Sequence, residues 1–187
     1  MPTLRRNDTA RRILDVALRL VQVQGFNAFS YADVSAELRI TKASLHHHFP
    51  TKAALGKALI SGYTADFLAA LAEIDARGGD AFAKLRAYAD IYLSVLRQER
   101  MCLCGMLAAD FETLPKAMRA SVTEFFRANE EWLARVLDEG RRAGTLRFEG
   151  AMLVARSFGG VSRLEAVVDR LLASLRRVPP SRARVAC

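Results

Sequence analysis

The stretch that decides the fold runs from residue 30 to residue 55 and reads SYADVSAELRITKASLHHHFPTKAAL. Ser30, with Asp33 three residues later, predicts a capping box, because the hydroxyl can accept a free N–H of a first helical turn. Val34 and Leu38 follow one helical turn apart and predict an apolar face. A short helix is therefore expected to begin just after Ser30.

A second short helix is predicted directly after the first. The corner falls at Arg39-Ile40, because Thr41 is a second N-cap candidate from which a helical pattern resumes. Pro50 ends this helix, because the residue before a proline is disfavoured in the α region. Thr51 then caps a third helix that begins at Lys52. Two short helices joined by a tight corner predict a helix-turn-helix, whose second helix enters the major groove of DNA.

The side chains of the second short helix fit contact with DNA. Leu45 and Phe49, four residues apart, are its predicted buried stripe. The outward residues can all bond to phosphates or base edges and none is acidic: Lys42, Ser44, His46 and His47. A plain helical corner in a globular protein gives the same pattern, so the pattern alone leaves both interpretations open.

The run TKASLHHHFPTK, from Thr41 to Lys52, preceded by VSAELRI, resembles the DNA-binding signature of the tetracycline-repressor (TetR) family. With RRIL at residues 11–14 and Gly25-Phe26, the resemblance covers about residues 8 to 60. It implies a homodimeric regulator with an inducer site among its C-terminal helices. The residues expected to contact DNA are Arg5, Arg6, Ser30, Tyr31, Thr41, Lys42, Ser44, His46, His47 and Lys52.

Two positions depart from the family pattern. Arg39 stands where members commonly have glycine, and an L-residue in the left-handed conformation costs about 1 kcal/mol. His46 stands where members commonly have tyrosine, so its contact with a phosphate would differ in kind.

Composition narrows the class of protein. The chain has 187 residues, 51% of them hydrophobic, which excludes a disordered chain and allows one domain or two small ones. No apolar run approaches a membrane span, and the N-terminus is too polar for a signal peptide. Three cysteines without framework spacing argue against a disulfide scaffold. We therefore expect a soluble, cytoplasmic protein.

The positive charge is concentrated at the two ends of the chain. Residues 1–60 carry 9 Lys and Arg against 4 Asp and Glu, a net charge of +5, and residues 61–175 carry 15 against 16. Residues 176–187 add four Arg and no acidic residue. A basic region that coincides with the predicted helix-turn-helix indicates a polyanionic partner.

The rest of the chain predicts an all-α fold. Residues 1–7 are expected to form a mobile arm and residues 176–187 a disordered basic tail. The expected division is a DNA-binding domain at 1–51 and an effector-binding and dimerisation domain at 52–175. The remaining helices are predicted at residues 8–24, 52–76, 80–98, 102–111, 115–139 and 151–175. The last two of these have wide apolar faces, which favours a four-helix interface with a second copy.

Cys102 and Cys104 form one unusual cluster, in the sequence MCLCG. Both lie at a predicted helix N-terminus after Arg97 and Arg100, where the helix dipole and nearby cations favour the thiolate. The segment MCLCGMLAAD, followed by LPKAMR, resembles thiol-switch repressors of the family, which have a cysteine where Cys102 stands. Sensing of an oxidant or electrophile and simple core packing both remain open.

An apolar effector is the other candidate signal. The residues predicted to sense or bind an effector are Cys102, Cys104, Tyr88, Tyr92, Met106, Phe111, Phe125 and Trp132, although such side chains are more often plain core. No cofactor and no metal site are expected, because the cysteines supply at most two ligands and three consecutive histidines diverge on a helix.

The function predicted from the sequence is a repressor released from its operator by an apolar molecule or by modification of Cys102. One rival is a nucleoid-type DNA binder, which would show no preference for an operator over random DNA. The other is a thiol-dependent enzyme, for which the sequence offers no second catalytic group.

Overall fold

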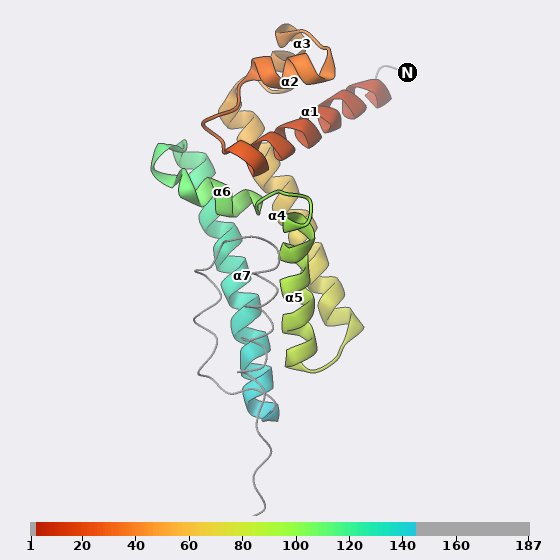
Figure 1. Ribbon diagram of the computed structural model, residues 1–187, viewed down its shortest axis with the longest axis vertical. Helices are drawn as coiled ribbons and strands as arrows, with labels where there is room; N and C mark the ends of the chain where they lie inside the picture. The colour runs from red at the N-terminus through yellow and green to blue at the C-terminus, as the bar shows by residue number, and fades with distance from the viewer. Residues whose placement is uncertain (1–2, 145–187) are drawn as a thin grey trace, which may run out of the picture. The chain divides into compact units, whose positions relative to one another are not determined.

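A computed structural model describes residues 3–144, which are almost entirely helical (Figure 1). Its elements are α1 (Thr3–Gln24), α2 (Tyr31–Leu38), α3 (Lys42–His48), α4 (Lys52–Arg77), α5 (Ala81–Leu96), α6 (Leu103–Ala109), the 3-10 helix η1 (Phe111–Thr113) and α7 (Lys116–Ala143). No strand occurs within this range, so the predicted all-α class is confirmed. The predicted helix at 151–175 and the predicted tail lie outside the described residues.

The described chain divides into two compact units. The first unit contains residues 3–73 and 94–130, and the second contains residues 74–93 and 131–144. The first unit therefore holds α1, α2, α3 and α6 whole, together with the first parts of α4 and α7. The domain boundary predicted at residue 51 concerns function and stays a prediction.

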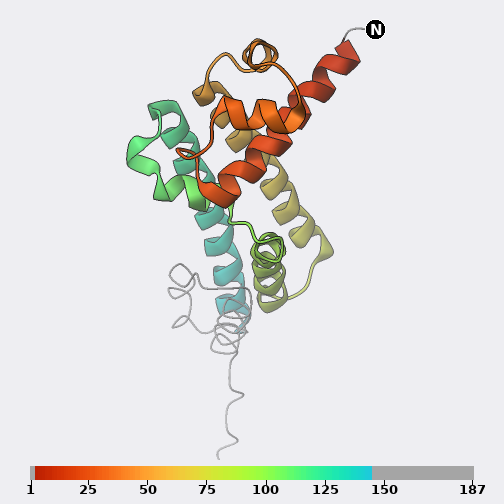
Figure 2. The same ribbon diagram turned by 45° about the horizontal axis from the view of Figure 1, so that its top comes forward.

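Helices α1, α2 and α3 lie together in the first unit (Figure 2), and each contributes buried apolar side chains to its core. Phe26 and Phe29, in the loop after α1, are 5% and 1% exposed and meet edge to face at 5.7 Å, so both belong to the core. Burial of such side chains supplies the main free energy for folding. The other buried side chains of this core are Ile13, Ala17, Val21, Val34, Leu45 and Leu55.

The predicted helix caps are present. The Ser30 hydroxyl accepts the N–H of Asp33 at 3.4 Å, and the Asp33 carboxylate accepts the N–H of Ser30 at 2.7 Å, which completes a capping box. The Thr41 hydroxyl accepts the N–H of Ser44 at 3.1 Å. The Thr51 hydroxyl caps α4 in the same way at 3.0 Å. Each cap satisfies an N–H that the helix itself cannot pair.

Arg39 makes the corner of the helix-turn-helix in a left-handed conformation, with φ 54° and ψ 42°. Its N–H donates to the Ala36 carbonyl at 3.3 Å, and the N–H of Ile40 donates to the Ser35 carbonyl at 3.1 Å. These two bonds form a Schellman motif, which usually places glycine at the left-handed position. The left-handed corner is thus formed by an arginine, at a position where glycine is more usual.

The predicted bounds of four helices were wrong. Helix α7 ends at Ala143, four residues later than predicted. Helix α1 begins at Thr3, so residues 3–7 are not the predicted arm; the sequence from Thr3 to Gln24 contains neither proline nor glycine. Helix α5 runs only from Ala81 to Leu96, and α6 ends at Ala109, two residues earlier than predicted, before η1. Helix ends depend on tertiary contacts that periodicity does not report.

We predict that Arg39→Gly stabilises the protein. Removing the left-handed penalty of roughly 1–2 kcal/mol gains more than the roughly 0.5–1 kcal/mol of added chain entropy. A net gain of about 0.5–1 kcal/mol raises the melting temperature by a few degrees. Glu99, with φ 57°, should behave alike, whereas Ala36→Gly within α2 should destabilise. A thermal melt in which Arg39→Gly falls below wild type would contradict this prediction.

Candidate functional site

Helix α3 exposes one continuous face. Leu45 is fully buried, and Ser44 and His48 are half-buried. The exposed positions of the helix are spaced as one face of two turns: Lys42, Ala43, His46 and His47. Ala43 is absent from the residues predicted from the sequence. Its place in the first turn of a recognition helix, where base contacts concentrate, is the signal that could have identified it.

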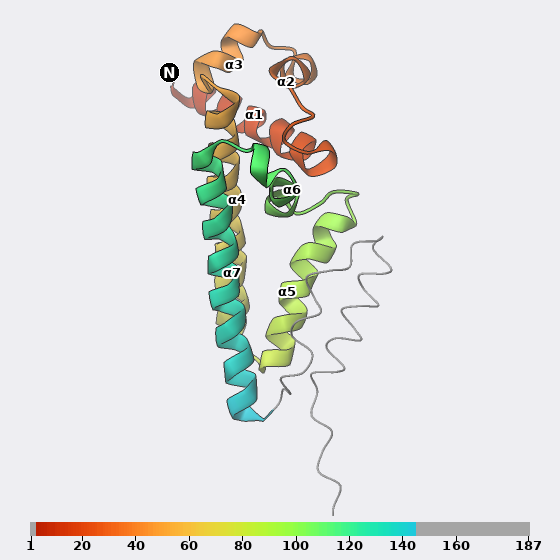
Figure 3. The ribbon, with the colours of Figure 1, turned by 90° about the vertical axis from the view of Figure 1, so that its left-hand side faces the viewer.

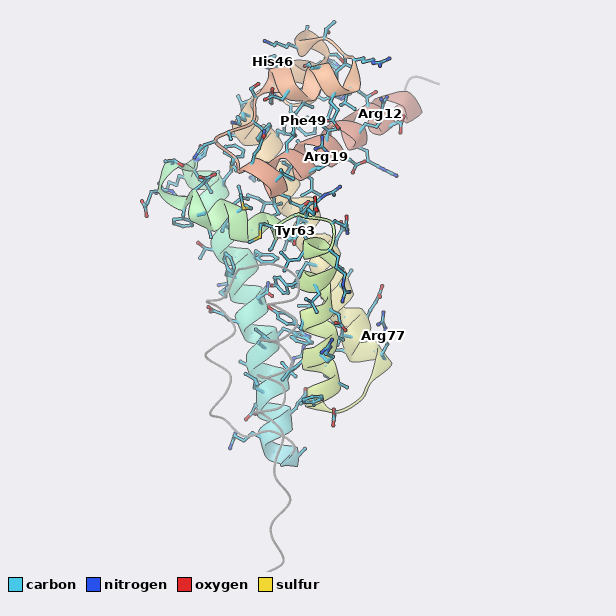
Figure 4. The ribbon with its side chains drawn as sticks, in the orientation of Figure 1. Arg12, Arg19, His46, Phe49, Tyr63 and Arg77 are labelled. Carbon is cyan, nitrogen blue, oxygen red and sulfur yellow. The ribbon has the colours of Figure 1, made fainter. Side chains whose placement is uncertain are left out.

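Tyr31 and His46 both bond to the turn between α3 and α4, and Figure 4 labels His46 and Phe49. The Tyr31 hydroxyl donates to the Phe49 carbonyl at 2.8 Å, and His46 Nδ1 lies 3.1 Å from the Pro50 carbonyl. Their ring centroids are 4.8 Å apart, and burial raises the pKa of Tyr31 to about 12. Because a carbonyl only accepts, His46 Nδ1 carries a hydrogen, and Nε2 is the ring nitrogen left for another partner.

The other predicted DNA-contact residues divide by location. The hydroxyls of Ser30 and Thr41 are used in helix caps. The Lys52 ammonium lies 4.7 Å and 4.5 Å from the ring centroids of Phe26 and Phe29. Burial lowers the pKa of Lys52, and the negative charges of Asp110 and Asp33 partly offset this by raising it. Arg5 and Arg6 belong to α1, and their side chains lie outside the described part of the chain.

Cys102 lies at the N-cap of α6 against an aromatic group in the first unit. The Tyr63 hydroxyl, on α4, donates to Cys102 Sγ at 3.4 Å. The Tyr63 ring lies 6.5 Å from the ring of Phe67 and 5.9 Å from that of Phe125, and α4 and α7 run side by side here (Figure 3). Burial, followed by the charge of Cys102, raises the pKa of Tyr63 far above its usual range, so Tyr63 is a neutral donor. Tyr63 was not predicted, although it precedes Phe67 by one helical turn.

Cys104 is fully buried, whereas Cys102 is 9% exposed. Burial and then the charge of Cys102 raise the pKa of the Cys104 thiol well above its usual range. The prediction that the helix dipole and nearby arginines favour a thiolate is therefore wrong for Cys104, because desolvation outweighs them. Both thiols are free.

The remaining predicted effector residues do not form one group. In the second unit, the rings of Tyr88 and Trp132 stack at 5.4 Å, and the hydroxyls of Tyr88 and Tyr92 lie 3.1 Å apart. In the first unit, Met106 and Phe111 are half-buried. The structure thus divides these candidates between the two units.

A polar network joins α4, α5 and α7 within the second unit. It was not predicted from the sequence. Asp75 accepts hydrogen bonds from Trp132 Nε1 at 3.1 Å and from Arg135 at 2.9 Å. Lys84 lies 2.8 Å from Glu139 and 3.4 Å from Asp75. The Arg135 bond is the main cause that lowers the pKa of Asp75, and the Glu139 bond raises that of Lys84. The network fixes Trp132, one of the predicted effector residues.

Residues 3–144 lack two features that mark other classes of protein. No helix there is long and apolar enough to cross a membrane. No three His, Cys, Asp or Glu side chains gather there as a metal site requires.

Comparisons with known proteins agree on one family. A family model described as "Bacterial regulatory proteins, tetR family" matches residues 13–59. The crystal structure of a TetR-family transcriptional regulator from Agrobacterium tumefaciens is 31% identical, with a TM-score of 0.83, and the match covers 92% of this chain and 100% of that one. A TetR transcriptional regulator from Legionella pneumophila is 33% identical, with a TM-score of 0.73, covering 88% and 96%. The transcriptional repressor NemR of Escherichia coli K12 is 26% identical over 151 residues, 79% of this chain and 76% of NemR.

We predict that N-ethylmaleimide alkylates Cys102 before Cys104. Cys102 retains some exposure, whereas Cys104 is fully buried and its pKa is raised, and the thiolate is the reacting form. The measurement is peptide mass spectrometry over time, in a protein carrying Cys187→Ser so that only the two thiols of the cluster react. In denaturant the two rates should converge. Faster modification of Cys104 in the folded protein would contradict the prediction.

Proposed function

The chain belongs to the TetR family of transcriptional regulators, and we propose that it is a homodimeric repressor that binds a palindromic operator through two helix-turn-helix units. The observation that carries this proposal is the exposed face of α3, with Lys42, Ala43, His46 and His47 and no acidic side chain. The net charge of +5 on residues 1–60 supports it, as does the similarity to a repressor from E. coli. The family consists of regulators, so the protein is not an enzyme.

Each residue of the exposed face has a role that its chemistry permits. Lys42, in the first turn of α3, is suited to guanine O6 and N7, and the Ala43 methyl group to the methyl group of a thymine. His47 can donate to a phosphate or a base edge. His46, held by the Pro50 carbonyl, offers Nε2 from a fixed position. We propose that Ser30, Tyr31, Thr41 and Lys52 stabilise the position in which α3 presents this face.

Dimerisation sets the spacing of the two α3 helices. A two-fold dimer reads half-sites about 34–36 Å apart, one turn of DNA or a multiple of it. We propose that α7 and the chain after it form the interface. Phe126 of α7 is 37% exposed in one copy, which supports an apolar contact there.

We propose that the signal acts in the C-terminal helices, either as an apolar molecule or as an electrophile at Cys102. The buried Tyr63–Cys102 bond supports the second form, because an adduct on Sγ cannot fit without displacing the Tyr63 hydroxyl. With an activated alkene, an S–C bond forms and the thiol proton passes to the adjacent carbon, so no oxidant is needed. The stacked rings of Tyr88 and Trp132 support an apolar molecule as the signal, because aromatic side chains line apolar ligand sites.

We predict that the protein binds an operator, obtained by selection from random DNA, roughly 10³-fold or more tightly than random DNA. Lys42→Ala should weaken operator binding by about 1–3 kcal/mol, whereas Lys116→Ala, at the exposed start of α7, should leave it unchanged. Fluorescence anisotropy at several salt concentrations measures both effects. Equal affinity for operator and random DNA would exclude a specific regulator.

The same assay tests Cys102. In the Cys187→Ser protein, N-ethylmaleimide should release the operator, and Cys102→Ser should prevent the release. Release that is equal in both proteins would exclude Cys102 as the sensor and leave the apolar effector.

We predict that one thymine of each half-site is read by the Ala43 methyl group. Replacing that thymine with deoxyuridine removes only the 5-methyl group and should weaken wild-type binding several-fold. Ala43→Gly should bind more weakly overall and should no longer distinguish thymine from deoxyuridine. If no half-site position shows this loss of discrimination, Ala43 does not read a thymine.

A further inference from the structure

The two ends of α6 are hydrogen-bonded to the end of α1 and to the loop that follows it. At the first end, the N–H of Met101 donates to the carbonyl of Gln22, a residue only 4% exposed. At the other end, one oxygen of the Asp110 carboxylate accepts the N–H groups of Phe26 at 3.0 Å and of Asn27 at 3.4 Å. Bonds to an ionised acceptor are stronger than neutral ones, so Asp110 is the firmer attachment.

Neighbouring groups hold the loop against Asp110. The Asn27 side chain donates to the Thr113 hydroxyl at 2.8 Å, and that hydroxyl donates to the Asp110 carbonyl at 2.7 Å. Gly25 has φ +89°, and a Cβ there would come within 3.2 Å of the Asp110 carboxylate. The close approach of the loop therefore needs glycine at this position.

Lys52 links the same carboxylate to the helix-turn-helix. Its ammonium lies over the rings of Phe26 and Phe29, and the charges of Asp110 and Asp33 both act on it. Asp33 closes the capping box at the start of α2. Asp110 thus connects α6 to the loop before α2, and Lys52, at the start of α4, packs on two rings of that same loop.

Resting on the proposed function, we propose that Asp110 is a positioning residue for DNA binding. It fixes the loop at residues 25–29, and hence the helices that read DNA, on α6. A change at Cys102, the residue at the opposite end of α6, reaches the DNA-reading helices through Asp110. Helix α6 spans only Leu103–Ala109, so a displacement of one end is carried to the other.

Asp110→Ala tests this role through the selectivity of DNA binding. Without the carboxylate the loop is less firmly placed, so operator affinity should fall roughly 2- to 30-fold. Affinity for random DNA should stay nearly constant, because contacts with phosphates do not require exact placement of α3. A purely structural role would lower the fraction of active protein and would leave the ratio of the two affinities unchanged.

Two variants serve as controls. Asp110→Asn keeps an oxygen that can accept the loop N–H groups, so it should retain most of the selectivity. Glu112→Ala removes an exposed carboxylate two residues away and should behave as wild type. Selectivity in Asp110→Ala equal to that of wild type would overturn the positioning role.

The signalling role is tested with N-ethylmaleimide in the Cys187→Ser background. Alkylation should reduce operator affinity in the protein with Asp110 and should cause little further loss in Asp110→Ala. An equal further loss in both would show that the signal takes another route and would overturn this part. Failure of the proposed function is distinguishable, because the unalkylated protein with Asp110 would then bind operator and random DNA alike.

Discussion

The carboxylate of Asp110, which accepts two N–H groups of the loop before α2, fixes how the DNA-reading helices stand on α6. Apolar packing supplies most of the free energy of this unit, but it is non-directional and does not by itself set an orientation. Hydrogen bonds from two N–H groups to one carboxylate oxygen, at 3.0 Å and 3.4 Å, do set a direction. The loop approaches this carboxylate closely at Gly25, where an added Cβ would lie 3.2 Å from the carboxylate oxygen.

Local chemistry explains why much of the helix-turn-helix could be predicted from the sequence. The caps at Ser30, Thr41 and Thr51 act within three residues, so their hydrogen bonds follow from the order of residues alone. The corner at Arg39 is also determined by its neighbours. The caps and the core on either side impose a left-handed conformation on a residue that does not favour it. The conformation was predictable, although the usual glycine is absent.

Contacts between distant residues explain what could not be predicted. Lys52 is a cation beside a DNA-binding motif, yet its ammonium lies against two phenylalanine rings. In the sequence Cys104 follows Arg97 and Arg100, which would favour its thiolate, yet desolvation by burial dominates and raises the pKa of its thiol. Tyr63 lies 39 positions from its partner Cys102, and Asp110 lies 84 positions from its partner Phe26. No periodicity within one helix indicates such partners. For Lys52, Tyr63 and Asp110 the deciding partner comes from a segment far away in the sequence.

The most direct test of the link between α6 and the DNA-reading helices is hydrogen exchange at the N–H groups of Phe26 and Asn27. The exchange would be followed by NMR before and after Cys102 is alkylated, in a protein with Cys104→Ser and Cys187→Ser. Both groups should exchange faster after alkylation, by roughly tenfold if the link weakens by about 1.4 kcal/mol, while the N–H of Leu45 within α3 keeps its rate. Unchanged exchange at Phe26 and Asn27 on fully alkylated protein would contradict the link.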